Sequence, residues 1–397
     1  MIRFLHTADW QIGMKARHVA GAGKKVRAVR FDTIRHLLKV AVQRQADFII
    51  VAGDIFEDNQ VSNRLVHELL SILEQCSLDI YLLPGNHDPL TADSIYWRPT
   101  LVNNLPDNVH ILTTYDRVQP LTGVIILPAP CFERKSNNDP TSHWAVAKDD
   151  AVKIGVAHGS LMIEGKYQTN DHPIALDTVL RQGLDYLALG HWHSLFSWDQ
   201  RTYYCGTPEP TGFGELRGGN VLLVSIAGPG QVPEVEPIPV NNLIWEQWEY
   251  DLGIGLENIL SLLKRRVGQL NKPEKTLVRL ALVGHVSAVE STSIDEMVQW
   301  LNQRLFYLDL DQERLWAQPV TASLLNRARN QPFLQGLLTD LKVAAGILGT
   351  SLTDIPEDVV ARAGPDPEII DSLIQEGFGL EDIREAVRQL ASLVEEV

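Results

Sequence analysis

Short apolar runs alternate with amphipathic stretches through the first half of the chain. Two stretches, 29–42 and 63–73, carry apolar residues at helical spacing. The apolar runs between and after them are too short for helices of that kind and are typical of buried strands. Strands are expected at Ile2–Thr7, Phe48–Ala52, Ile80–Leu83, Val124–Leu127, Val152–Ala157, Tyr186–Leu189, Thr202–Cys205 and Val221–Ile226. The alternation predicts an α/β domain.

A stretch rich in proline and glycine, 228–239, predicts a domain boundary. We therefore expect a first domain over residues 1–235, a small α/β domain over 240–320 and a helical C-terminal segment over 330–397. The small domain is predicted to contain strands Ile244–Tyr250, Thr276–Val283 and Arg314–Gln318 and helices Leu256–Val267 and Ile294–Phe306.

The charge of the chain is unevenly distributed. Its 397 residues carry a formal net charge of −15, which at first argues against a nucleic-acid partner. However, residues 351–397 hold twelve acidic residues against three arginines, whereas residues 15–44 hold nine lysines or arginines against Asp32 alone. A basic stretch near the start and an acidic end restore DNA as a candidate partner.

Sequence features also indicate the cellular compartment in which the protein is expected. No apolar run is long enough to span a membrane, and no secretion signal is expected at the start. The three cysteines are scattered, so neither a disulfide framework nor a zinc spacing is indicated. We expect a cytoplasmic protein that does not insert into a membrane.

Polar side chains follow the expected strands at the points where they end. These residues are Asp9 and Gln11 after the first strand, Asp54, the Asn86-His87-Asp88 run, His158, and His191 with His193. Ligands gather at the carboxyl ends of strands in open α/β sheets, so these side chains are expected to meet. Carboxylate, amide oxygen and imidazole together suit Mn, Fe or Zn better than Mg or Ca alone. A lone Gly-Asp or Gly-His is ordinary turn chemistry, and the prediction depends on the whole ordered set.

The ordered motifs resemble those of calcineurin-like metallophosphoesterases. The segments TADWQIG, GDIFED, GNHD, GHWH and YCGTPEPTGFGE are similar to those of SbcD-type DNA repair nucleases. The likeness covers about residues 1–220, and the small α/β domain corresponds to the capping domain of that family. It implies a four-layer α-β-β-α sandwich, two divalent cations (manganese in such families) and a water that attacks phosphorus in line.

The resemblance assigns roles to the predicted residues. It places one metal among Asp9, Gln11, Asp54 and His193, and the other among Asp54, Asn86, His158 and His191. It makes His87 the histidine that acts on the scissile phosphate without binding metal, and Asp88 the residue that orients His87.

Two positions depart from the family pattern. Gln11 stands where the family carries histidine. Because an amide offers an oxygen but no imidazole nitrogen, one metal should be held less tightly, or metal preference should change, or the site should work with one metal. Glu57 stands where relatives carry histidine or aspartate, and we expect an acid outside the direct ligand set.

The basic stretch and two tryptophans have two interpretations each. Lys15, Arg17, Lys24, Lys25 and Arg27 either form a solvated surface or track DNA phosphates beside the metals. Trp10 and Trp192 either pack in the core or stack on a base.

The resemblance also implies partners. Similar nucleases work with an SbcC-like ABC ATPase and dimerise through helices of the first domain, so the helical stretch Glu368–Val394 is either a dock for that ATPase or a hairpin packed on its own domain. Two rival functions remain open: a phosphodiesterase or phosphatase for small substrates, and a weakly active scaffold for the ATPase.

Overall fold

The computed structural model describes residues 1–19, 21–144, 150–215, 217–286, 288–317 and 322–347, and beyond them the short segments 359–360, 366–375, 379, 382–383, 386–387 and 389–390. The chain divides into two compact units, one of Met1–Glu246 with Lys275–Leu277 and one of Gln247–Glu274 with Val278–Val397. Much of the predicted C-terminal helical stretch lies outside the described residues.

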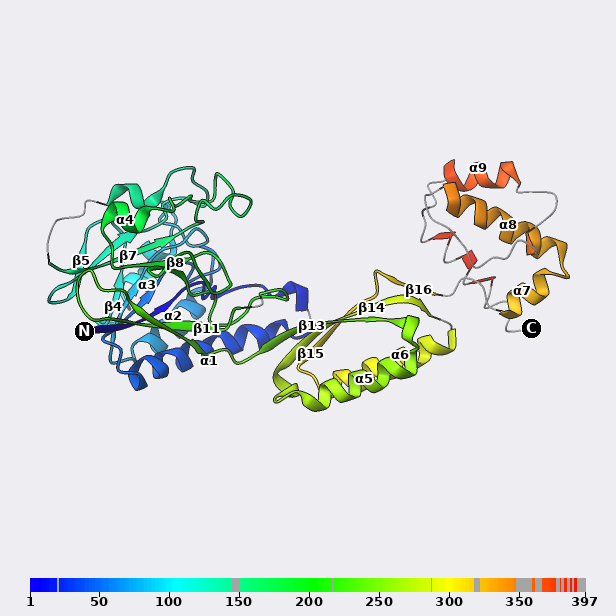
Figure 1. Ribbon diagram of the computed structural model, residues 1–397, viewed down its shortest axis with the longest axis horizontal. Coiled ribbons are helices and arrows are strands. Elements are labelled where there is room, and N and C mark those ends of the chain that lie inside the picture. Colours follow the sequence, from blue (N-terminus) through cyan, green and yellow to red (C-terminus); the bar gives the residue numbers. More distant parts are fainter. Residues whose placement is uncertain are drawn as a thin grey trace. The chain divides into compact units, whose positions relative to one another are not determined.

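Two six-stranded sheets form the centre of the first unit (Figure 1). The first sheet has the order β12 (Glu234–Pro239), β11 (Asn220–Ile226), β1 (Ile2–Thr7), β2 (Phe48–Val51), β3 (Asp79–Leu82), β4 (Val109–Ile111). The second has the order β5 (Val118–Leu121), β6 (Val124–Ala129), β7 (Val152–His158), β8 (Tyr186–Gly190), β10 (Thr202–Tyr204), β9 (Phe196–Ser197). Strands β1 to β4 are parallel to one another, as are β6, β7, β8 and β10.

Alternating side chains along the strands build the layers. In β2, Phe48 and Ile50 point into the core between the two sheets, where they join residues such as Ile154 of β7. Ile49 and Val51 point the other way and pack under helices α1 (Gly23–Gln43) and α2 (Asn63–Leu73). Short helix α4 (Thr178–Gln182) packs on the outer face of the second sheet. The predicted helix-sheet-sheet-helix sandwich is confirmed.

Helix α1 begins at Gly23, earlier than the expected Val29. Its first turns contain Lys24, Lys25 and Arg27. These residues do not continue the apolar pattern on which the prediction depended, but lysine and arginine favour helix. Helix α2 has the expected bounds. The stretch 228–239, predicted as a domain boundary, contributes the edge strand β12, in which two prolines are tolerated because the outer side of an edge strand needs no donors.

Most of a four-stranded sheet belongs to the second unit; its strands are β13 (Ile244–Asp251), β14 (Thr276–Val286), β15 (Tyr307–Asp311) and β16 (Leu315–Ala317), and the first residues of β13 and β14 belong to the first unit. Helices α5 (Leu256–Gln269) and α6 (Ala288–Asn302) bury residues such as Leu263 and Leu301 in the same core as Leu280. A separate apolar core follows, built on α7 (Ala322–Ala328), α8 (Pro332–Ile347) and residues up to Leu390. Helix α9 (Pro367–Gln375) is the last described helix. The three-domain division itself stays a prediction.

Within the described residues, no helix combines the length and the apolar character that a bilayer crossing requires.

Candidate metal centre

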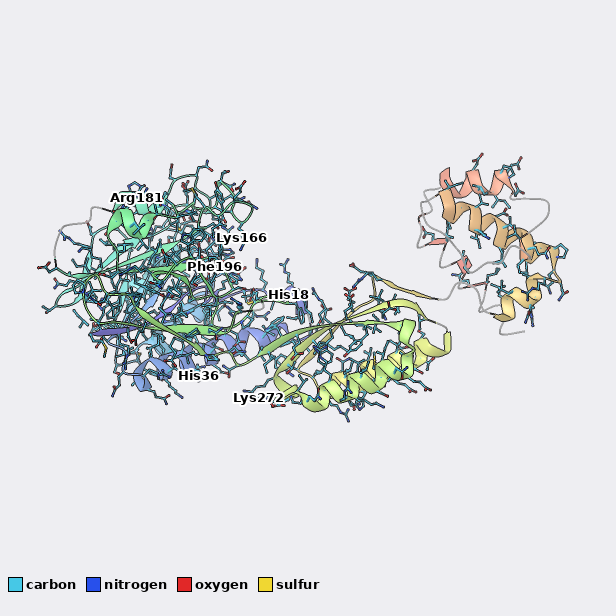
Figure 2. All side chains as sticks on the ribbon, viewed as in Figure 1. His18, His36, Lys166, Arg181, Phe196 and Lys272 are labelled. Carbon is cyan, nitrogen blue, oxygen red and sulfur yellow. The ribbon has the colours of Figure 1, made fainter. Side chains whose placement is uncertain are left out.

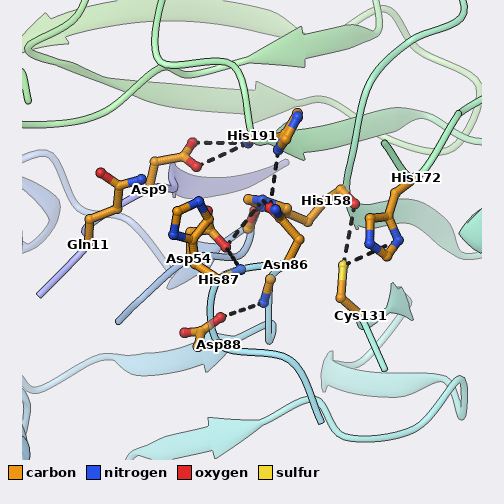
Figure 3. Close-up of polar contacts among 12 residues, drawn as sticks. Asp9, Gln11, Asp54, Asn86, His87, Asp88, Cys131, His158, His172 and His191 are labelled. Carbon is orange, nitrogen blue, oxygen red and sulfur yellow. Dashed lines mark hydrogen bonds and ion pairs between the residues drawn. The ribbon is translucent and has the colours of Figure 1, made fainter. Parts of the chain in front are cut away.

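Residues from the carboxyl ends of both sheets of the first unit converge on one place (Figure 3). Ligand atoms of Asp9, Asp54 and His158 lie within 4.8 Å of one another, and all three side chains are buried. Asp9 follows β1, Asp54 follows β2 and His158 ends β7. The two sheets therefore supply a shared cluster of carboxylate and imidazole donors, the mixture that borderline divalent metals prefer.

The carboxamide of Asn86 joins the histidines of this cluster. Its Oδ1 lies 2.8 Å from His158 Nε2 and 3.2 Å from His191 Nδ1. Both carboxylate oxygens of Asp9 accept a hydrogen bond from the backbone N–H of His191, at 3.1 Å each. The structure thus brings together Asp9, Asp54, Asn86, His158 and His191.

In His158, His191 and His193, one ring nitrogen lies within hydrogen-bond distance of a carbonyl or carboxylate oxygen. His158 Nδ1 lies 2.9 Å from the carbonyl oxygen of Ala52. His191 Nε2 lies 2.8 Å from Asp171 Oδ2, and His193 Nδ1 lies 2.8 Å from Glu215 Oε1. Metal-binding histidines characteristically donate one N–H to a carbonyl or carboxylate, which turns the other nitrogen toward the ion. Asp171 and Glu215 were not predicted; Glu215 closes the GFGE segment, whereas no sequence pattern marks Asp171.

Gln11 lies at the edge of this cluster. Its Nε2 is 3.2 Å from His193 Nε2. Since His193 Nδ1 is bonded to Glu215, the Gln11 amide group faces the one nitrogen of His193 that a cation would use. To serve as a metal ligand here, the Gln11 amide must turn to present its oxygen.

The backbone is strained at several of these positions. Asp9, Gln11, Asp54 and His191 adopt φ values of 55°, 44°, 53° and 98°. Left-handed backbone is uncommon for residues other than glycine, and it tends to persist at functional sites where the surrounding structure enforces it. Gly85 permits the close approach of the β3 loop, because a Cβ at this position would lie 2.2 Å from Asp54 Oδ1.

The buried carboxylates of the cluster favour the binding of positive charge. Burial by itself would lower the pKa of His158, but the neighbouring Asp54 carboxylate raises it above its usual value. Burial would raise the pKa of Asp54, and His158 instead holds it below its usual value. Two buried carboxylates, Asp9 and Asp54, need compensating cations. The residues present therefore fit a divalent metal.

His87 and Asp88 have different surroundings. The backbone N–H of His87 donates to Asp54 Oδ1 at 2.9 Å, and its ring Nδ1 lies 3.0 Å from the carbonyl oxygen of Glu57. The carboxylate of Asp88 accepts from the backbone N–H groups of Phe56 and Gly85 and from the hydroxyl of Tyr96, at 2.9, 2.7 and 2.7 Å. Asp88 thus ties the loops after β2 and β3 together, and the Glu57 carbonyl oxygen lies against the His87 imidazole. The orienting role of Asp88 stays a prediction.

A cavity of about 430 Å³ opens over the cluster. Asp54, His87, His191 and His193 line it, together with a wall of residues from the loop after β1. That wall includes Lys15, Arg17 and His18, but Lys24, Lys25 and Arg27 do not line the cavity. The structure thus separates the predicted basic stretch into cavity residues and exposed residues of α1.

Another residue of the basic stretch and the two tryptophans have structural roles. Arg30 is buried and donates to the backbone carbonyls of Trp10 and Glu209, each at 2.9 Å. Trp10 is 1% exposed and belongs to the core under α1, which resolves its two interpretations. Trp192 stacks on Tyr204 with ring centroids 4.4 Å apart and is partly buried.

Comparisons with known proteins agree with this geometry. Residues 2–195 match the family described as calcineurin-like phosphoesterase. The chain is 23% identical over 378 residues to an uncharacterized metallophosphoesterase, YhaO, of Bacillus subtilis, covering 86% of this chain and 87% of that protein. It is 25% identical over 281 residues to one subunit of the nuclease SbcCD of Escherichia coli, covering 60% and 68%. It is 24% identical over 298 residues to the DNA double-strand break repair protein Mre11 of Sulfolobus acidocaldarius, covering 68% and 73%.

Proposed function

We propose that this chain, whose residues 2–195 belong to the calcineurin-like phosphoesterase family, hydrolyses phosphodiester bonds in DNA with two divalent cations, manganese foremost. The observation that carries the proposal is the buried cluster of Asp9, Asp54 and His158, of which Asp54 lines a cavity whose wall holds Lys15 and Arg17. Buried carboxylates and imidazoles hold cations, and cationic side chains beside them hold phosphates.

Two groups of residues are proposed to hold the cations. Asp9, Gln11, Asp54 and His193 form one group, and Asp54, Asn86, His158 and His191 form the other, so that Asp54 is shared. Bound cations supply charge that stabilises both the attacking and the leaving oxygens of a phosphodiester and lower the pKa of a water molecule. The chain holds these ligands rigidly through Ala52, Asp171 and Glu215.

His87 is the proposed proton carrier. With Nδ1 directed at the Glu57 carbonyl, the ring lines the cavity and leaves Nε2 for the substrate. A proton on Nε2 can stabilise charge on the phosphate or pass to the leaving oxygen as the bond from phosphorus breaks.

Nuclease assays with the full-length chain test the proposal. With manganese, labelled single-stranded, blunt duplex and hairpin DNA should be cut, and DNA should compete against a small chromogenic diester. His87→Ala should lower kcat by about 10²–10⁴-fold without changing manganese stoichiometry. His67→Ala, an exposed histidine on α2, is the matched control and should cut normally.

Two results would replace the proposal. Cleavage of the small diester without cleavage of any DNA would support a phosphodiesterase for small substrates. Normal manganese binding without cleavage of either substrate would support the scaffold.

An ABC-type ATPase is the proposed partner, docking on residues 351–397. The name of the Escherichia coli relative marks that protein as one subunit of a complex. Co-purification of the full-length chain with the ATPase, lost on deletion of 351–397, is the expected result. Equal binding after the deletion would remove this dock. Cytoplasmic location also stays a prediction.

A further inference from the structure

A buried carboxylate outside the metal cluster lies in the loop after β10. Glu209 is 1% exposed, and its side chain contacts both α1 and residues 240–243, the exit segment, which connect β12 to β13. Its Oε2 accepts from the hydroxyl of Thr33 on α1 and, at 2.7 Å, from the backbone N–H of Asn242. Its Oε1 accepts from the backbone N–H of Leu243 at 3.1 Å. The carboxylate therefore joins α1 to the exit segment.

Helix α1 also holds the exit segment at a second point. His36 of α1 lies with Nδ1 3.0 Å from the carbonyl oxygen of Val240 (Figure 2). Val240 and Leu243 are each 1% exposed, so the exit segment is packed against the first unit. A buried carboxylate is costly unless it is hydrogen-bonded, and each oxygen of Glu209 accepts a backbone N–H. The exit segment is therefore fixed by specific polar contacts.

The backbone of Glu209 connects these contacts to Asp9. The carbonyl oxygen of Glu209 accepts from Arg30 Nη1 at 2.9 Å and lies 2.8 Å from the hydroxyl oxygen of Thr207. The same two side chains reach the carbonyl oxygen of Asp9, with Thr207 Oγ1 at 3.0 Å and Arg30 Nη2 at 3.4 Å. Both side chains are buried. A continuous set of hydrogen bonds thus runs from the exit segment to a residue of the metal cluster.

Backbone strain and buried charge make this support important for Asp9. The φ of 55° at Asp9 is uncommon for aspartate and persists only where the surrounding structure enforces it. Burial lowers the pKa of the Arg30 guanidinium, and nearby carboxylates, Glu209 foremost, raise it. Without Glu209, Arg30 would lose the largest of its compensating charges, and a buried cation without compensation is strongly unfavourable. We therefore expect the contact of Arg30 with Asp9 to depend on Glu209.

We propose that Glu209 is a positioning residue for the metal centre, and that it couples manganese binding at Asp9 to the exit segment. Coupling between two sites is reciprocal. An exit segment held in place therefore favours the metal, and metal binding in turn holds the exit segment. The inference rests on the proposed metal binding by Asp9 and does not depend on whether DNA is the substrate.

Hydrogen–deuterium exchange of the full-length chain, with and without manganese, tests the coupling without turnover. Manganese should slow exchange of the N–H groups of Asn242 and Leu243 about tenfold more than that of Gly230. The N–H of Gly230 donates to Asp185, another buried carboxylate, which precedes β8, whereas His191 follows the carboxyl end of that strand. Equal slowing of all three N–H groups would report only the stability of the whole unit and would overturn the coupling.

Glu209→Gln removes the negative charge and turns an amide N–H toward a backbone donor. It should lower manganese affinity about tenfold in isothermal titration calorimetry and abolish the extra protection of the exit segment. Asp185→Asn is the matched control, because Asp185 also accepts from two backbone N–H groups. This variant should keep the affinity and the extra protection, even where its unfolding midpoint falls.

A second pair of variants tests the path through Thr207. Thr207→Val keeps the shape of the side chain but removes the hydroxyl that lies between the carbonyl oxygens of Asp9 and Glu209. It should lower manganese affinity and the extra protection as Glu209→Gln does, whereas Thr207→Ser should behave like the native chain. This pair decides the matter if Glu209→Gln does not fold.

The outcomes separate this inference from the proposed function. Native manganese affinity and native protection in Glu209→Gln would overturn the positioning role while metal binding persists. Equal losses in Asp185→Asn would also overturn it, because the effect would then follow from general loss of stability. If the native chain binds no manganese, the proposed function fails, and the inference fails with it.

Discussion

At the scale of single residues, the carboxylates behind the histidines determine how well the centre is organised. Asp171 Oδ2 accepts from Ser160 Oγ at 2.7 Å and faces His191 Nε2 at 2.8 Å, so the imidazole cannot turn freely. The hydrogen bond with His191, the largest influence, lowers the pKa of Asp171 to about 2, although burial opposes the shift. Asp171 is therefore charged at neutral pH.

Asp171→Ala should weaken manganese binding about 10–100-fold, because partners of ligand histidines have effects of that size. Isothermal titration calorimetry measures the affinity. Asp177→Ala, an exposed aspartate nearby in sequence, is the control and should bind normally. Unchanged affinity in Asp171→Ala would mean that His191 does not ligate.

Gln11→His should tighten the weaker manganese site. An imidazole offers a nitrogen donor where the amide of Gln11 now faces His193 Nε2. Electron paramagnetic resonance titration of manganese should show weak second-ion occupancy in the native chain and stronger occupancy in the variant. Gln60→His, on an exposed residue, controls for incidental binding to a new histidine. Equal occupancy in Gln11→His and the native chain would contradict the assignment of Gln11.

His6 makes the stability of the fold dependent on pH. Burial lowers its pKa from 6.5 to about 3, and its Nδ1 lies 3.0 Å from the hydroxyl of Tyr186. Below pH 6.5 His6 binds a proton in the unfolded chain but stays neutral in the folded chain. The contribution of His6 to the free energy of unfolding is therefore complete above pH 6.5 and is lost as the pH falls toward 3. The free energy of unfolding should fall by up to about 1.4 kcal/mol per pH unit from this group.

Urea unfolding between pH 7 and pH 5 measures that slope. His6→Gln should be less dependent on pH than the native chain, whereas His67→Gln, with an exposed histidine, should keep the native slope. A native slope in His6→Gln would show that another group titrates.

At the scale of elements, the close approach of the loop after β3 to Asp54 requires glycine at position 85. Gly85→Ala would place a Cβ 2.2 Å from Asp54 Oδ1 and 2.3 Å from the Asp54 backbone nitrogen, so the loops after β2 and β3 must separate. We expect destabilisation of about 1–3 kcal/mol and loss of manganese binding. Gly228→Ala, where a Cβ meets nothing within 4 Å, should leave both unfolding and binding unchanged. Normal metal binding in Gly85→Ala would contradict this account.

The elements also show what the sequence could predict. Central strands such as β2 and β7 were predicted because both faces are buried and their apolar runs are continuous. Edge strands β5 and β12 were missed, because each contains proline and exposed positions interrupt its apolar pattern. The converging strand ends were predictable from motif order, whereas the hydrogen bonds that Asp88 accepts and the contact of Asp171 with His191 depend on loops that leave no periodic signal.

At the scale of the whole molecule, separate apolar cores predict separate unfolding. The core between the two large sheets and the core under α5 and α6 belong to different units. Differential scanning calorimetry should show more than one transition. Manganese should raise the transition of the first unit, by about 2.7 kcal/mol of stability at a hundredfold excess over Kd, because the proposed ligands all lie in that unit.

A variant with His158→Ala is the control and should show a smaller shift with manganese. A single transition that moves as a whole would mean that the two units unfold cooperatively.

The donors come from both large sheets: Asp9, Asp54 and Asn86 from the first, His158 and His191 from the second. Metal affinity is therefore a gauge of how the sheets are aligned. A substitution in the core between the two sheets, such as Ile154→Ala, should lower the affinity for the metal ions, because one sheet can then shift against the other. Inactive variants recovered by random mutagenesis should accordingly map to this buried seam as well as to the cavity.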